Sequence, residues 1–266
     1  MTPLLAQARC RFHSGHVELQ IRLYEPIGVL AARYAGIRAA LEEARIDYWC
    51  AGDRTIAEAA SDAGIDAVSL RERLEQAETD DLRIDWQGTS MRDLVTHLEH
   101  EHHQLLRSIV FHAAVVLNSA ATADADCTEP MRRTFRQLSS DLILHIEKEE
   151  HIFFPLLLSL DEARAKGLRS PAAPGEVRRN IDGFVRQHEA IGGALAQLRR
   201  DSAAVEPAGN EICRQLLRDL DVLERQVHEY LNLENYVVFP RAIALEDDLR
   251  TASPALTATP EKGGTS

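Results

Sequence analysis

Three absences limit what this chain of 266 residues can be. Its four cysteines are scattered and include no C-x-x-C pair, which argues against a disulfide framework and fits a reducing compartment. No apolar run approaches the roughly 20 residues that a membrane-spanning helix needs. Residues 1–11 lack the apolar core and cleavage site of a signal peptide. We therefore expect a cytoplasmic protein that is not inserted in a membrane.

Aromatic residues are scarce at 5%, and acidic residues outnumber basic ones, giving a formal net charge of −12. The chain has no basic stripe of the kind that nucleic-acid binding needs, so we expect no nucleic-acid partner. The abundance of Leu, Ala, Arg and Glu favours helices. Histidine is frequent, with eleven residues and a cluster at 97–103. The neutral imidazole is the commonest metal ligand in proteins.

One stretch carries a candidate metal site and occurs twice. His145 and Glu149 lie four positions apart, so on a helix they share a face and can reach the same metal. Tyr230 and Glu234 repeat this pattern further along the chain, at an offset of 85 in the numbering. A Phe-Pro pair follows each glutamate at the same distance, whereas the adjacent Glu150 fits a solvated face. The repeat indicates two similar helical hairpins.

A second pair of histidines extends the repeat. His103 and His188 show the same offset, so the positions 103, 145, 188 and 230 are spaced 42, 43 and 42. An all-α, up-down-up-down four-helix bundle produces this spacing when each helix contributes one residue to a layer near mid-height. The alternative is a coincidental set of core and surface histidines, which rarely keeps four such registers at once.

The residue types of this layer favour a dinuclear metal site. Glu149 and Glu234 are the candidate bridges, because carboxylates can span two metal ions about 3.5–4 Å apart. His103, His145 and His188 are the candidate terminal ligands. Imidazole and carboxylate without thiolate favour iron, with manganese as the alternative, over structural zinc.

Tyr230 stands where the repeat expects a fourth histidine, and three interpretations stay open. It binds a metal as a phenolate, or it stays protonated and leaves a metal position open for a small ligand, or it is packed core. His100 lies one turn before the first ligand histidine and is a candidate for supporting the ligands from outside. We expect His97 and His102 to be surface or packing residues, and His228 to lie off the metal-facing stripe.

The chain divides into segments of different character. Residues 1–20 predict a solvated arm, and residues 21–80 predict a small helical domain. A hinge at 81–88 leads to the bundle at 89–248. Residues 251–266 have the composition of a disordered tail.

Local signals place the helix ends. In the small domain, Pro26 predicts the start of one continuous helix, and Thr55 and Ser69 each begin a capping-box pattern. In the bundle, residues 118–129 predict a polar loop. Pro155 predicts an irregularity in the second bundle helix, because a proline inside a helix removes a hydrogen bond.

The His and Glu pattern of the bundle, with Phe-Pro after each Glu, resembles the hemerythrin-like (HHE) di-iron fold. The small domain is similar to that of the RIC family, di-iron proteins that repair iron–sulfur clusters after nitrosative or oxidative stress. The similar residues are 47–52 (Asp-Tyr-Trp-Cys-Ala-Gly) and 55–59 (Thr-Ile-Ala-Glu-Ala). Small domain and bundle together extend the resemblance over residues 21–245.

The resemblance implies four His and two Glu that hold an oxo- or hydroxo-bridged pair of iron ions. Tyr230 occupies the sixth position, where the family has its fourth His. The family's small domain carries two adjacent cysteines, whereas here Trp49 precedes Cys50. Cys50 is therefore a candidate redox thiol without a local partner. The ligands that carry over are His103, His145, Glu149, His188 and Glu234.

The resemblance also implies a role in iron–sulfur cluster repair and stress defence, by iron delivery or by binding and reducing nitric oxide. Expected partners are iron–sulfur proteins and the diatomic ligands NO and O2, and a homodimer is left open. A reversible O2 or NO carrier or sensor is one alternative. A di-iron oxidase or oxygenase using Tyr230 is another, although ferritin-like oxygenases use two Glu-x-x-His triplets and this chain has only Glu99 to His102. The last alternative is a metal-free scaffold, which would have to bury two carboxylates without metal ions to compensate their charge.

Overall fold

A computed structural model describes residues 20–77, 86, 88–123, 125–203 and 211–251. Among these residues the regular structure is helical, and the one β-type contact is an isolated bridge between Pro26 and Thr55. The predicted all-α class is confirmed. No helix of the described segments is both long and apolar enough to cross a membrane.

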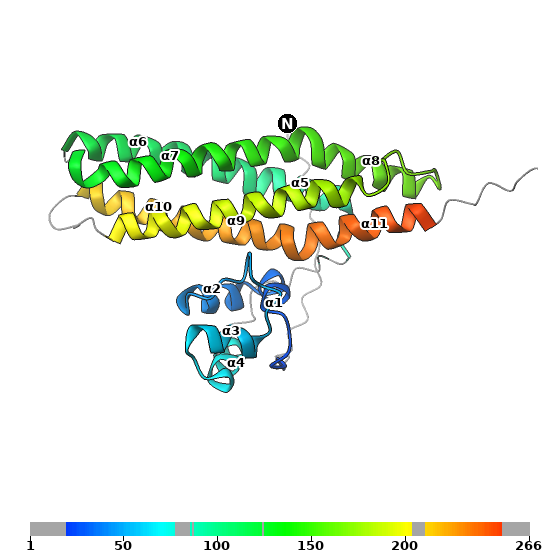
Figure 1. The fold of residues 1–266 in the computed structure, drawn as a ribbon, viewed down its shortest axis with the longest axis horizontal. Coiled ribbons are helices and arrows are strands. Elements are labelled where there is room, and N and C mark those ends of the chain that lie inside the picture. The colour runs from blue at the N-terminus through cyan, green and yellow to red at the C-terminus, as the bar shows by residue number, and fades with distance from the viewer. Residues whose placement is uncertain (1–19, 78–85, 87, 124, 204–210, 252–266) are drawn as a thin grey trace, which may run out of the picture.

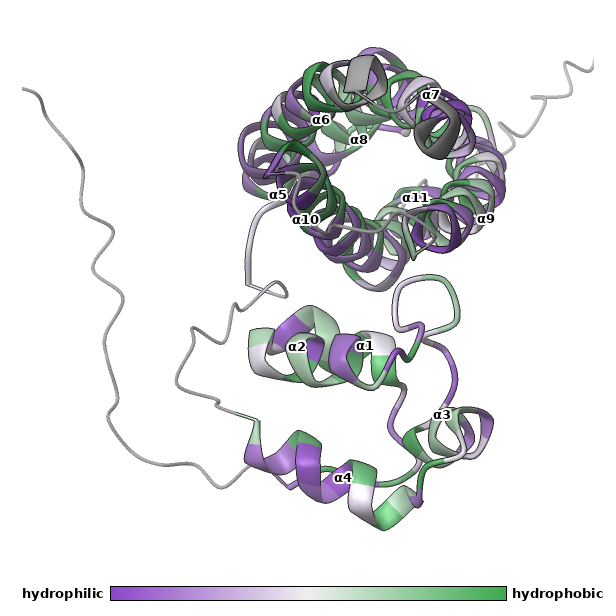
Figure 2. Cartoon of the chain, turned by 90° about the vertical axis from the view of Figure 1, so that its left-hand side faces the viewer, coloured by the Kyte–Doolittle hydropathy of each residue, from purple (hydrophilic) through white to green (hydrophobic). Residues whose placement is uncertain are grey.

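Four helical runs form the bundle, side by side and alternating in direction (Figure 1). Seen end-on in Figure 2, the runs surround one common axis. Three of the four runs are interrupted by a π-helical turn, labelled η. The runs are α5 (Met91–His97), η1 (Leu98–His103) and α6 (Gln104–Ala123); α7 (Ala125–Lys148), η2 (Glu149–Phe153) and α8 (Phe154–Ala165); α9 (Glu176–Ala203); and α10 (Glu211–Leu233), η3 (Glu234–Val238) and α11 (Phe239–Thr251).

The π turns coincide with the candidate ligands. At the end of each turn a backbone N–H reaches the carbonyl five positions back, from Gln104 to Glu99, Phe154 to Glu149 and Phe239 to Glu234. Pro155, which has no N–H to donate, follows in the first turn of α8. The irregularity predicted from Pro155 thus lies in the turn before it. Such turns are rare and occur mostly at functional sites.

The polar loop predicted at 118–129 is wrong. Helix α6 continues to Ala123, and α7 has already begun at Ala125. Leu117 and Met131, which flank this segment, are buried. Alanines in the segment have the best helix propensity, and the helices gain further stability from packing their apolar faces.

The small domain consists of four short helices beneath the bundle in both views (Figures 1 and 2). The single helix predicted after Pro26 is broken at Tyr34, whose backbone is extended (φ −131°, ψ 112°). An apolar core inside the domain compensates for helices that are too short to be stable alone. The helices are α1 (Ile27–Arg33), α2 (Ala35–Glu43), α3 (Ile56–Ala63) and α4 (Ala67–Gln76).

Of the two capping boxes predicted in this domain, the structure confirms one and contradicts the other. Thr55 and Glu58 form the reciprocal capping box at the start of α3, as predicted. The second capping box is wrong, because Asp66 is the N-cap of α4 and its side chain accepts the N–H of Ser69. Asp and Ser are equally good N-caps, so the local pattern did not decide between them.

An aromatic cluster surrounds the ligand layer. Phe153, Phe184 and Phe239 pack on one another with ring centroids 5.1–6.2 Å apart. Phe239 stacks on the ring of His188, and Phe184 meets the ring of His145 edge-on. The phenylalanines thus fix the orientation of the imidazole rings.

Truncating this cluster tests its share in stability. We expect Phe184→Ala to lower the free energy of unfolding by about 3–5 kcal/mol, because a buried ring is replaced by a cavity. Urea denaturation of the metal-free chain, followed by circular dichroism, measures the change. The matched control is Phe111→Ala, whose ring is 72% exposed and which we expect to shift stability by less than about 0.5 kcal/mol. Equal losses in both variants would contradict the packing described.

Candidate metal centre

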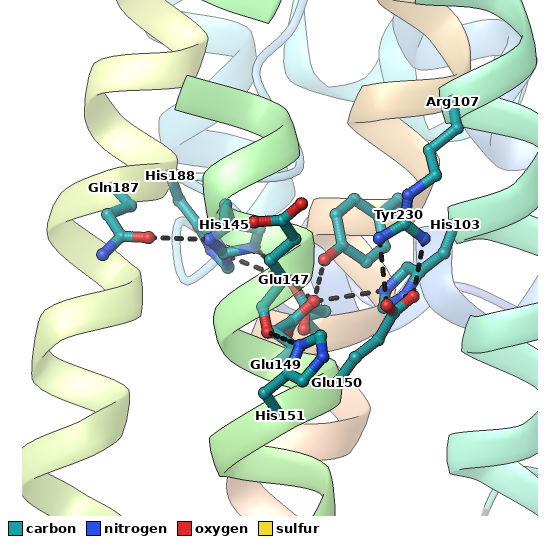
Figure 3. Close-up of polar contacts among 11 residues, drawn as sticks. His103, Arg107, His145, Glu147, Glu149, Glu150, His151, Gln187, His188 and Tyr230 are labelled. Carbon is teal, nitrogen blue, oxygen red and sulfur yellow. Dashed lines mark hydrogen bonds and ion pairs between the residues drawn. The ribbon is translucent and has the colours of Figure 1, made fainter. Parts of the chain in front are cut away.

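The structure brings the six sequence-predicted site residues together in one layer of the bundle. Figure 3 labels His103, His145, Glu149, His188 and Tyr230. The π turns hold three of them at their ends, and α-helices hold the others. Every one of these side chains is at most 1% exposed. They are His103 at the end of η1, His145 in α7, Glu149 at the start of η2, His188 in α9, Tyr230 in α10 and Glu234 at the start of η3.

Three of these residues form a compact group of donor atoms. Nε2 of His145 lies 3.3 Å and Nε2 of His188 lies 3.1 Å from Oε2 of Glu234. One donor atom from each residue lies within 4.8 Å of the other two. A single metal ion placed among them would contact two imidazoles and one carboxylate.

A second group lies around Glu149. Nε2 of His103 is 3.2 Å from Oε2 of this carboxylate, and Nε2 of His145 is 3.8 Å from the same oxygen. The phenol of Tyr230 donates a hydrogen bond to it. His145 therefore stands between the two carboxylates, and the two groups of donors are continuous.

The charges of this layer oppose one another. Burial, followed by the charge of Glu234, raises the pKa of Glu149 to about 7. Burial works against protonation of His145, but the two carboxylates outweigh it and raise the pKa of His145 to about 9. Burial, with the charge of His145, lowers the pKa of His188 to about 3. Burial and both carboxylates raise the pKa of Tyr230 well above its ordinary value.

Four inward-facing atoms make no hydrogen bond among the described residues, although the two imidazole nitrogens among them lie within ion-pair distance of a carboxylate. A buried, unpaired carboxylate oxygen is costly, and two such oxygens face the same small volume as two imidazole nitrogens. Cations bound between them would satisfy all four atoms at once. The residues present therefore fit a pair of metal ions. The unpartnered atoms are Nε2 of His103, Oε1 of Glu149, Nε2 of His188 and Oε1 of Glu234.

The outward-facing nitrogens of the imidazoles are all occupied. Nδ1 of His145 lies 3.0 Å from the amide oxygen of Gln187, and Nδ1 of His188 lies 2.9 Å from the amide oxygen of Asn235. An acceptor at Nδ1 fixes the tautomer in which Nε2 carries the lone pair towards the metal.

The third imidazole has a charged acceptor. Nδ1 of His103 lies 2.9 Å from a carboxylate oxygen of Glu150. Arg107 holds this carboxylate with two hydrogen bonds of 2.7 and 2.9 Å (Figure 3). The solvated role predicted for Glu150 is therefore wrong. The available signal was the repeat, because Glu150 and Asn235 are themselves related by the offset of 85.

The prediction for His100 is also wrong. Its side chain is exposed and bonds to Gln104, one turn along the helix. Position 100 falls inside η1, where the wider π turn displaces it from the face expected of an α-helix. The supporting role predicted for it belongs to Glu150.

Three further histidines of the described residues, His97, His102 and His228, lie outside the donor layer. His102 is buried and packs near Tyr230, with ring centroids 6.0 Å apart, and His97 packs against Trp86. His228 is buried at the contact with the small domain, where its Nδ1 lies 2.7 Å from Glu42. All three therefore have packing or pairing partners other than a metal.

Cys50, the candidate redox thiol, lies in the loop of the small domain next to the bundle. Burial, followed by the charges of Asp47 and Glu189, raises the pKa of its thiol to about 12. The thiolate is the reactive form, so these surroundings suppress its reactivity.

Comparison with known proteins agrees with this geometry. Residues 93–242 match the sequence profile of the hemerythrin HHE cation-binding domain. The chain belongs to the hemerythrin family. The match includes parts of all four helical runs and every residue of the donor layer.

Relatives of this hemerythrin-family chain extend the comparison beyond the bundle. The chain is 24% identical over 229 residues to the iron–sulfur cluster repair protein YtfE of Citrobacter koseri, and over 228 residues to that of Salmonella schwarzengrund. The same protein of Escherichia coli O17:K52:H18 is also 24% identical. Each alignment covers 84% of this chain and 98% of the relative, so the small domain is included. The predicted resemblance to cluster repair proteins is confirmed.

The raised pKa of Cys50 predicts slow alkylation. At pH 8 its thiolate fraction is far below that of an ordinary thiol with a pKa of about 8.5, and the thiolate population grows only as the pH approaches 12. We expect iodoacetamide to modify Cys50 at least about 100-fold more slowly in the folded chain than in the urea-unfolded chain. Mass spectrometry of the peptide containing Cys50 measures both rates. Similar rates would contradict the environment described.

Proposed function

We propose that this chain holds two iron ions between its four helical runs and acts in the repair of iron–sulfur clusters. The observation that carries the proposal is the buried layer of imidazoles and carboxylates with four unpartnered inward atoms. The near full-length alignment with proteins named for cluster repair supports the biological role. Iron–sulfur proteins would then be the partners.

The donor layer assigns ligands to two positions. His145, His188 and Glu234 would hold one ion, and His103 with Glu149 would hold the other. Each carboxylate has a free oxygen with which it can bridge. Donors of this kind suit iron or manganese, and the resemblance to cluster repair proteins favours iron. The bound pair would supply redox chemistry towards nitric oxide and a source of iron for damaged clusters.

The protein's own residues make the two positions unequal. The phenol of Tyr230 keeps its proton and donates a hydrogen bond to Glu149 instead of offering a lone pair to a metal. The metal position beside His103 therefore has one imidazole ligand fewer than the position beside His188. The phenylalanine cluster keeps bulk water from the layer. A small diatomic molecule such as NO or O2 would bind beside His103, where no side chain supplies the further ligand.

This unfilled position also favours a second candidate, a reversible carrier or sensor of O2 or NO. The two functions differ in what happens to the iron. A carrier retains its iron through binding and release of the ligand, whereas a repair protein loses iron to a cluster protein. Mixing the iron-loaded chain with an enzyme whose [4Fe–4S] cluster has been damaged by nitric oxide separates them. Recovery of enzyme activity with loss of iron from the chain supports repair, and iron retained without recovery supports the carrier.

The bridging role of Glu149 can be tested against its neighbour. We expect wild type to bind two iron ions per chain and Glu149→Gln to bind at most one, because the amide offers no charge to hold two cations. Glu147→Gln is the matched control, since Glu147 lies two positions away and is exposed. Iron analysis after anaerobic loading and desalting gives the stoichiometry. Two ions in Glu149→Gln would rule out the proposed bridge.

The hydrogen bond from Tyr230 to Glu149 predicts that the phenol is not a ligand. We expect Tyr230→Phe to bind as much iron as wild type, and neither protein to show a phenolate-to-iron absorption band. Visible spectra of the ferric proteins, recorded side by side, check this. A band in wild type that disappears in Tyr230→Phe would show that Tyr230 binds iron, and would favour the oxidase or oxygenase alternative.

A further inference from the structure

A path of two hydrogen bonds joins one candidate ligand to the small domain. Nδ1 of His188 lies 2.9 Å from Oδ1 of Asn235, and Nδ2 of the same amide donates to the backbone carbonyl of Trp49 at 2.6 Å. Because Nδ2 of Asn235 donates to the Trp49 carbonyl, the amide oxygen faces His188 and accepts a hydrogen bond from its Nδ1. A single side chain therefore connects the metal layer to the loop of the other domain.

The loop itself is tightly held against the bundle. The indole of Trp49 stacks on His228 with centroids 3.3 Å apart and planes 8° apart. Nδ2 of Asn232 donates to the carbonyls of Gly28 and Tyr48, both at 3.0 Å. These contacts place the Trp49 carbonyl at a defined point beside Asn235.

In the first half of the bundle, side chains of the bundle itself take the place of this contact between Asn235 and the small domain. There, Glu150 accepts from the ligand imidazole and Arg107 holds Glu150. The repeat relates Glu150 to Asn235 and Arg107 to Gly192, each at the offset of 85. The second half thus has a neutral acceptor, and its counterpart of Arg107 has no side chain with which to hold it.

Gly192 leaves room for the loop to supply that support. A Cβ added at Gly192 would lie 3.6 Å from Nε1 of Trp49 and 3.8 Å from Sγ of Cys50. A longer side chain would occupy the place of the loop. In the second half of the bundle, the small domain therefore supports the acceptor of the ligand histidine, as Arg107 does in the first half.

We propose that the small domain is the outer support of His188, and that Asn235 is the positioning residue that couples docking of this domain to metal binding. The proposal rests on the proposed metal pair and extends it to the second domain. Coupling between two equilibria is reciprocal. Metal binding should therefore tighten the docked loop, and loosening the loop should weaken metal binding at the His188 position.

The test uses the full chain with two readouts. Ferrous iron affinity is measured anaerobically by competition with a chelator. Docking is measured by hydrogen exchange of the loop, whose reporter amides are those of Trp49, Cys50 and Ala51, all of which donate to Asp47. In wild type, we expect iron loading to slow exchange of these amides.

Two substitutions of Asn235 separate its two bonds. Asn235→Ala removes both, so we expect faster loop exchange and iron affinity about 10–100-fold lower at one position. Asn235→Asp keeps an acceptor for His188 but loses the donor to the Trp49 carbonyl. We expect a loop that exchanges rapidly and no longer responds to iron, and an iron affinity between those of wild type and Asn235→Ala. Glu150→Gln is the matched control, and should weaken iron binding without altering the loop's response to iron.

A second pair of variants acts from outside the hydrogen-bond path. Gly192→Leu would displace the loop, whereas Gly192→Ala adds only a Cβ at ordinary contact distance. Both replacements raise helix propensity, so neither should unfold α9. We expect the leucine variant to release the loop and lower iron affinity several-fold, and the alanine variant to behave as wild type.

The outcomes distinguish this inference from the proposed function. A released loop in Gly192→Leu with unchanged iron affinity would overturn the coupling and leave the metal pair intact. A loop in Asn235→Asp that still responds to iron would do the same. No iron bound by wild type would overturn the proposed function and the coupling together.

Discussion

The burial of two carboxylates in the core of the bundle is the constraint on which the rest of the structure depends. Glu149 and Glu234 are fully buried, and Nε2 of His145 lies within 3.8 Å of an oxygen of each. Placing two such charges away from water is tolerable only with cations to compensate them. The imidazoles supply part of this charge, as the raised pKa of His145 shows. The unpartnered atoms of the layer indicate where metal cations would supply the remainder.

The surrounding elements serve to hold this layer. The π turns place both glutamates and His103 at their ends. Phenylalanines fix the imidazole rings from one side, and polar acceptors fix them from the other. The arrangement is a preorganised site, in which the orientation of each ligand is set before any metal binds.

The sequence repeat predicted the bundle and the members of the layer because helical periodicity and the register between the two halves are global properties of the chain. It could not predict the π turns, because such turns are rare and the α-helical periodicity of the sequence carries no signal for them. For that reason the α-helical periodicity places His100 on the wrong face. Asn235 was missed because a polar residue beside a ligand resembles a solvent-facing one.

The two hairpins differ in the residues that lie behind the ligands. Register relates His145 to Tyr230, and Gln187, the acceptor for His145, to His102, which packs near Tyr230. Glu150 similarly corresponds to Asn235. One half supports its histidine with its own carboxylate and an arginine, and the other half relies on the small domain. The repeated frame thus carries an unequal site.

Anomalous X-ray diffraction at the iron edge, from crystals of the iron-loaded chain, tests the central claim most directly. The account predicts two anomalous peaks about 3.5–4 Å apart, both between Glu149 and Glu234, one nearer His103 and the other nearer His188. A single peak, or peaks confined to the surface of the bundle, would contradict it.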